Sequence, residues 1–247
     1  MEQTVAVLTT QPPWVRGPAF TTDTEIVLDE SRAQSYQLGN PNWAQDLLFE
    51  LAALSPMISR YEAGVNPNDA VAFVQRWGLL WHGSSQVGSG ECRESLDDWL
   101  QSSNKLLFRL YFYQWLMEAP RDDPEEIARG FSELGVQSPA SLQTAEDHLQ
   151  SASTYLEGVI NEALQGCTWE LITYKPGRFA FNQCPPNLEA SAYAYFAELA
   201  NSGPQLKRCS GCGRPFRPET SRQKYHNQRC ANATRWRRWK ENKVSTT

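Results

Sequence analysis

Four residues of metal-binding types stand in two close pairs near the end of the chain. Cys209 and Cys212 are separated by two residues, His226 and Cys230 by three, and thirteen residues lie between the pairs. A tetrahedral Zn2+ ion is bound by sets of this kind, in which a turn presents two thiolates and about one helical turn presents the other two ligands. This spacing constrains the fold strongly, because the segment must bring both pairs together.

The four residues predict a structural zinc ion, one per chain. They fill all the positions of a tetrahedral ion, whereas a catalytic zinc keeps one position for water. Between Cys212 and Cys230 the only carboxylate belongs to Glu219, so a metal-bound water has few candidates for a general base. A segment of about forty residues buries too little apolar surface to fold alone, so metal binding and folding should be coupled.

Charge is divided unevenly along the chain. Residues 205–243 contain twelve Lys or Arg and two acidic residues, a balance of +10, whereas the whole chain has a net charge of −5 and the remainder therefore carries −15. An acidic body with a basic end is typical of proteins that bind nucleic acid through that end. We predict an acidic helical domain over residues 1–203 and a basic zinc module over residues 204–247.

The stretch over residues 229–243 contains no helix breaker and is predicted to continue as a helix from the metal site. On a helix, Asn232, Trp236 and Trp239 share one face, and the basic residues can neutralise phosphates while Asn232 or an arginine reads base edges. In the alternative, both tryptophans pack on the acidic body and the arginines pair with it. The predicted nucleic-acid contacts are Arg229, Asn232, Arg235, Arg237, Arg238 and Lys240.

A tail of this form behind an acidic helical domain resembles the bacterial CGNR-type zinc-finger proteins, whose N-terminal part is called the ABATE domain. The resemblance implies a treble-clef zinc module in a stress-responsive transcription regulator that binds DNA. Three features depart from the family pattern: Ala-Asn-Ala replaces Gly-Asn-Arg after Cys230, His226 stands where a cysteine is usual, and the first cysteine pair is closer than in many members. The matching residues are Cys209, Cys212, Gly213, Phe216, His226, Cys230, Asn232 and the basic run 235–240.

The predicted fold class is mainly α, with a β-hairpin and short N-terminal strands. Lys175-Pro176-Gly177 separates two strand-like runs, 168–174 and 178–182, which predict the hairpin. Cys167 and Cys184 bracket it and are expected to be reduced. Apolar spacing and cap signals predict helices over 42–54, 69–77, 95–118, 124–134, 139–164 and 187–200, and strands over 4–8 and 25–28.

Location and partners are predicted from what the chain lacks. No apolar run approaches the length that spans a membrane, and the first residues have neither the basic region nor the apolar stretch of a secretory signal. We expect a cytoplasmic protein, in which thiolates stay reduced and available to a metal, with no membrane partner.

The acidic body shows no recognisable catalytic pattern. His82 and His148 are isolated in the sequence, and the paired acids at 97–98, 122–123 and 125–126 suit helix N-termini. We therefore predict that the protein is not an enzyme, although a catalytic group assembled only in three dimensions stays open. The aromatic positions of the 95–118 helix, Phe108, Tyr111, Phe112 and Trp115, are typical of a buried bundle helix; a ligand pocket or a dimer face is the alternative.

Together these features predict a zinc-finger nucleic-acid-binding protein. The simplest form is a DNA-binding transcription regulator whose N-terminal domain senses a small-molecule effector or forms a homodimer. Two other classes stay open. One is a protein-interaction adaptor whose zinc only stiffens the tail, and the other is an RNA-binding protein in which Trp236 or Trp239 stacks on bases.

Overall fold

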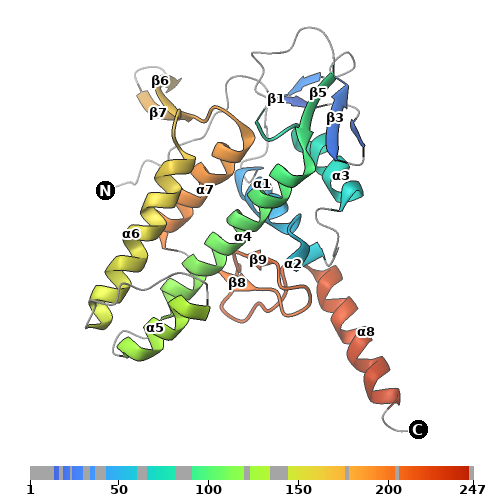
Figure 1. Cartoon of the computed structure of the whole chain (residues 1–247), viewed down its shortest axis with the longest axis vertical. Coiled ribbons are helices and arrows are strands. Elements are labelled where there is room, and N and C mark those ends of the chain that lie inside the picture. Colours follow the sequence, from blue (N-terminus) through green and yellow to red (C-terminus); the bar gives the residue numbers. More distant parts are fainter. Residues whose placement is uncertain are drawn as a thin grey trace. The chain divides into compact units, whose positions relative to one another are not determined.

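The computed structural model describes residues 14–16, 19–22, 24–29, 34–36, 43–59, 66–81, 91–119, 123–133, 144–175, 178–203 and 206–244. The fold is mainly helical with small antiparallel strand pairs, as predicted (Figure 1). Two compact units are present, the first formed by residues 1–106 and 154–201 and the second by residues 107–153 and 202–247. The tail thus shares a unit with helices from the middle of the chain, and its independence as a module over 204–247 stays a prediction.

The helices begin near the predicted positions. They are α1 (Trp43–Ala53), α2 (Pro56–Ser59), α3 (Pro67–Trp77), α4 (Leu96–Glu118), α5 (Pro124–Glu133), α6 (Ala145–Ala163), α7 (Leu188–Ser202) and α8 (Gln228–Val244). Asn66 caps α3 by accepting the backbone N–H of Asn68, and Pro67 occupies the first helical turn. These local signals explain why α3 begins at Pro67 and not at the predicted residue 69.

Helix α6 begins later than predicted. The hydroxyl of Thr144 accepts the backbone N–H of Asp147, and the Asp147 carboxylate accepts the Thr144 N–H, which is the reciprocal pattern of a capping box. The helix therefore begins at Ala145. The predicted start at Pro139 lies outside the described residues.

The strands form four small antiparallel sheets. In the largest, β3 (Glu25–Asp29) lies between β2 (Ala19–Thr21) and β5 (Glu91–Ser95), and Ile26 and Leu28 of β3 are buried on the face toward the core. Strand β1 (Trp14–Arg16) pairs with β4 (Gln34–Tyr36), and α3 packs against β1, β2 and β3. The predicted strand over 25–28 is confirmed, β1, β2, β4 and β5 were not predicted, and residues 4–8 lie outside the described residues.

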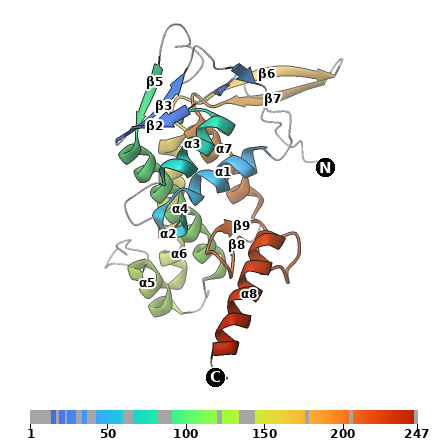
Figure 2. The same cartoon turned by 90° about the vertical axis from the view of Figure 1, so that its right-hand side faces the viewer.

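The predicted hairpin is also confirmed. Strands β6 (Thr168–Lys175) and β7 (Arg178–Cys184) run side by side as a long ribbon (Figure 2). Thr168 lies opposite Cys184, so Cys167 and Cys184 are neighbours at the base of the ribbon, and neither forms a disulfide. Burial raises the pKa of the Cys167 thiol, and the nearby Cys184 raises it further.

The core of the first unit contains a buried carboxyl group. Glu94 at the end of β5 is only 5% exposed, and its two oxygens accept the backbone N–H groups of Leu80 at 2.9 Å and Trp81 at 2.7 Å. The indole N–H of Trp99 donates to it at 2.8 Å. Glu189 in the first turn of α7 accepts the indole N–H of Trp81 at 2.7 Å and a hydroxyl of α4. The polar atoms around Glu94 thus have partners inside an apolar core.

In the second unit, α5 packs on the C-terminal half of α4 through aromatic rings. Phe131 makes edge contacts with Phe112 and Trp115, at centroid distances of 5.8 and 5.3 Å. His148 of α6 is buried with its ring 6.3 Å from that of Phe131, so it is a core residue. The other isolated histidine, His82, lies outside the described residues.

Candidate metal centre

The tail folds as a short hairpin followed by a helix. Strand β8 (Lys207–Arg208) pairs with β9 (Pro215–Phe216), and both lie beside the start of α8 (Figure 2). Residues 209–214 form the turn between the strands, which we call the knuckle. Its backbone is closed by a hydrogen bond from Gly213 N to Cys209 O at 2.8 Å, and Gly213 has φ of +80°, where an L side chain is strained. The predicted turn that presents the first two thiols is therefore present.

The knuckle and α8 bring the four predicted ligands together. One ligand atom from each of Cys209, Cys212, His226 and Cys230 lies within 4.8 Å of the others. Sγ of Cys209 is 3.4 Å from Sγ of Cys230, and Sγ of Cys212 is 3.6 Å from Nδ1 of His226. Ligands placed about 2.0–2.3 Å from a tetrahedral ion lie roughly 3.3–3.8 Å apart. This Cys3His cluster could hold a metal ion.

Asn227 positions two of the ligands, and the sequence analysis did not identify it. Its Oδ1 accepts the backbone N–H of Cys230 at 2.8 Å, which caps the start of α8. Its amide nitrogen is 2.9 Å from Nε2 of His226, so the ring is held with Nδ1 toward the thiols. The available signal was an Asn two residues before the predicted helix and three residues ahead of a ligand.

Helix α8 lies directly against the knuckle at Gly211. A Cβ at this position would be 2.6 Å from both Sγ of Cys230 and Oγ1 of Thr234, a distance that real Cβ atoms do not show. The carbonyl of Gly211 accepts a hydrogen bond from Nη2 of Arg237 at 2.8 Å. Arg237 was predicted to contact nucleic acid, and the structure shows that part of its guanidinium binds the knuckle.

The thiols of the cluster influence one another. Burial of Cys209 opposes its ionisation, but hydrogen bonds from His226 and from the backbone N–H groups of Gly211 and Cys212 outweigh burial and lower its pKa to about 6. Burial, together with the neighbouring Cys209 and Cys212, raises the pKa of Cys230 to about 12. A bound cation reverses this mutual suppression, because a thiol that coordinates a metal loses its proton.

Most of the predicted nucleic-acid contacts lie on one side of α8. At 100° per residue, six residues share a continuous face that is turned away from the knuckle, whereas Ala231 and Thr234 are buried toward it. Arg238 is exposed on a different side. We call the six residues the outer face; they are Arg229, Asn232, Arg235, Trp236, Trp239 and Lys240, all exposed.

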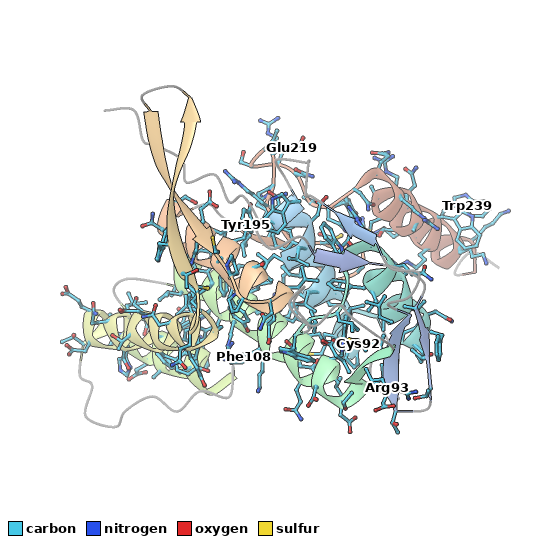
Figure 3. All side chains as sticks on the ribbon, turned by 90° about the horizontal axis from the view of Figure 1, so that it is seen from above. Cys92, Arg93, Phe108, Tyr195, Glu219 and Trp239 are labelled. Carbon is cyan, nitrogen blue, oxygen red and sulfur yellow. The ribbon has the colours of Figure 1, made fainter. Side chains whose placement is uncertain are left out.

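The outer face combines cations with open aromatic rings. Trp236 and Trp239 are 56% and 55% exposed, and Figure 3 shows Trp239 standing out from α8. The ammonium groups of Lys240 and Lys243 lie 4.0 Å and 4.6 Å from the centroids of these rings, in cation–π geometry. Within their own unit both tryptophan rings are therefore open, and the alternative in which they pack on the acidic body stays untested.

Comparison with known proteins adds no relative to these observations. No protein-family model matches the chain, and no curated protein matches it. The resemblance to CGNR-type proteins therefore depends on the tail residues alone. Within the described part of the chain, no helix combines the length and apolar character needed to cross a membrane.

Proposed function

We propose that the Cys3His cluster binds one structural Zn2+ ion and that the metal-stabilised tail binds nucleic acid through the outer face of α8. A soft set of three thiolates and one imidazole suits zinc among the common divalent ions. One observation carries the proposal: a complete set of four ligands lies at the start of an exposed basic helix. A metal bound there would fix α8 at its first turn.

Charge and dimensions both support a nucleic-acid partner. The only acid in the described loop between β9 and α8 is Glu219, which Figure 3 shows well apart from Trp239. The outer face spans residues 229–240, about 17 Å of helix at 1.5 Å per residue. An α-helix of this size fits the major groove of duplex DNA. Duplex DNA in transcription control is therefore the partner that we propose first, in agreement with the CGNR-type resemblance.

The exposed tryptophans favour a second candidate. Trp236 and Trp239 are open rings on a basic surface, and rings of this kind stack on unpaired bases at about 1–3 kcal/mol per base. Single-stranded RNA is therefore the alternative partner. The affinity for single-stranded RNA would depend more on the tryptophan rings than on the cations, whereas the affinity for duplex DNA would depend more on the cations.

The test is fluorescence anisotropy with labelled duplex DNA and single-stranded RNA over a range of salt concentrations. The triple variant Arg229→Gln, Arg235→Gln, Lys240→Gln removes three cations of the outer face. Its matched control, Arg217→Gln, Arg222→Gln, Lys224→Gln, removes the same charge from exposed positions of the β9–α8 loop. If the outer face binds phosphates, the first variant alone lowers the slope of log affinity against log salt by about 0.9 per lost contact.

Three outcomes separate the alternatives. Equal losses in both triple variants contradict a role specific to the outer face. Unchanged affinity in the first variant contradicts nucleic-acid binding by this helix and favours the adaptor hypothesis. Replacing both tryptophans by alanine identifies single-stranded RNA if RNA affinity falls by at least tenfold while duplex affinity stays within twofold.

A further inference from the structure

The second unit contains a cavity that the proposed function does not use. Its volume is about 440 Å³, and residues of α4, α5 and β8 line it. Small-molecule sites in proteins have volumes of about 300 to 1,000 Å³. The aromatic positions of α4 were predicted to be buried, and Tyr111 and Phe112 are. Tyr111 and Trp115 also belong to the wall of the cavity, which corresponds to the pocket given as the alternative.

Aromatic rings give the cavity a preformed wall. Trp115 is held between α4 and α5, where it contacts the ring of Phe131. Gly130 of α5 makes room for the indole, since a Cβ there would lie 2.3 Å from Nε1 of Trp115. A planar ligand can therefore lie against a ring whose place is fixed before binding.

A buried acceptor in the wall lacks a partner. Oε1 of Gln114 is buried and makes no hydrogen bond with any described residue, although the amide nitrogen of the same side chain donates to Glu118 at 3.4 Å. Buried polar atoms of folded proteins are nearly always paired, and an unpaired one carries a desolvation cost. The atom is covered by the protein and offers no surface to a ligand in the cavity, so this cost belongs to the fold itself.

A cation completes the set of binding groups. The guanidinium of Arg208 lies 3.6 Å from the centroid of the Tyr111 ring, and no carboxylate of the described residues is paired with it. A guanidinium stacked in this way keeps its N–H groups free at the edges, where a planar acid group binds through two hydrogen bonds. The second arginine of the wall, Arg129, is 3.5 Å from Glu126 and is already paired.

We propose that this cavity binds a small planar organic acid. Its acid group pairs with Arg208, and its ring lies against Trp115. This proposal does not depend on nucleic-acid binding.

Two residues of the cavity wall also connect it to the metal-binding module, our name for β8, the knuckle, β9 and α8 with the loop between them. Arg208 directly precedes the ligand Cys209, and the hydroxyl of Tyr111 donates to the carbonyl of Gly213 at 2.9 Å. A compound held by Arg208 therefore restrains the strand that leads into the knuckle. This position is suitable for an effector of the tail.

The proposal is tested by titration calorimetry on the full-length, zinc-loaded chain with two related compounds. Benzoate has the ring and the acid group, and benzamide has the same shape without the charge. We expect benzoate to bind about tenfold more tightly than benzamide. Absence of benzoate binding at millimolar concentration, or equal affinity for both compounds, overturns the assignment.

One variant assigns the binding to Arg208. Arg208→Gln should weaken benzoate binding by at least tenfold and leave benzamide binding unchanged, whereas the control Arg217→Gln, at an exposed arginine that does not line the cavity, should change neither. Thermal melting checks the fold independently. Undiminished benzoate affinity in a folded Arg208→Gln protein overturns the proposal.

Discussion

The buried polar groups of the first unit and those of the metal-binding module are stabilised by different interactions. In the first unit, Glu94 is surrounded by large apolar side chains and accepts three N–H groups of the protein itself. In the module, buried apolar side chains are few, and ligand atoms that suppress one another's ionisation lie within 4.8 Å. The first arrangement is complete with protein atoms, whereas the second is a cluster that could hold a metal ion, as we propose. The two regions should therefore fail under different treatments.

The largest expected difference follows from removing one ligand. Cys230→Ala should release the metal and unfold the module, because structural zinc contributes about 10–16 kcal/mol at neutral pH in small zinc domains. The melting transition of the first unit should persist. Zinc per chain is measured by mass spectrometry of the metal, with Cys167→Ala as a control that keeps full zinc. A full zinc complement in Cys230→Ala would show that the cluster is not the metal site.

The converse change targets the buried carboxyl group. Glu94→Gln places an amide where three N–H groups converge, so at least one donor loses its acceptor, and we expect a loss of roughly 2–5 kcal/mol in unfolding free energy. Zinc content should stay unchanged. Urea denaturation measures this loss. The control is Glu25→Gln, which breaks an exposed ion pair with Arg93 and should lower the unfolding free energy by less than about 1 kcal/mol. If both variants cost the same, the comparison between the two interiors is wrong.

Acid should distinguish the regions through the thiols. The pKa of Cys209 is lowered to about 6 in the folded chain. Ionisation of this thiol therefore stabilises the folded module, and the contribution is complete at pH values above the ordinary thiol pKa. It declines as the pH falls and is lost below about pH 6. Zinc binding must expel the proton of Cys230 throughout this range, and below about 6 it must also expel that of Cys209. The apparent zinc affinity should therefore fall more steeply below pH 6, by about tenfold more per pH unit for each added proton.

A zinc-binding dye that competes with the protein measures this pH dependence. His226→Cys keeps four ligands but removes the imidazole hydrogen bond that lowers the Cys209 pKa, so the change of slope should move to higher pH. An identical profile in that variant would contradict the assigned cause.

The smallest expected effect concerns Asn227. Asn227→Ala removes the cap of α8 and should cost about 1 kcal/mol, seen as faster loss of zinc to a chelator. Asn227→Asp keeps an oxygen for the N–H of Cys230 and should restore most of the slow rate. Asn232→Ala, on the outer face, is the matched control and should leave zinc loss unchanged. Slow zinc loss in Asn227→Ala would mean that the ligands alone position the helix.

The sequence predicted best what depends on nearby residues. The cysteine and histidine spacing, the long α4 helix and the β6–β7 hairpin all arise from short-range patterns. Strand β5 was missed because its sequence is polar and its pairing with β3 joins residues more than sixty positions apart. The start of α6 was misplaced because two cap signals compete, and the one at Thr144 begins the helix that is seen. The wall that joins α4, α5 and β8 depends on tertiary packing and could not be derived from any one segment.

Gly211 has a consequence for how this module can change in evolution. Because a Cβ there would meet both the sulfur of Cys230 and the hydroxyl of Thr234, the contact cannot be relieved on the cysteine side without losing a ligand. A smaller residue at position 234 would relieve only the contact with the hydroxyl, and the contact with the sulfur would remain. Chains that share this ligand spacing should therefore keep glycine at position 211, whatever residue stands at 234.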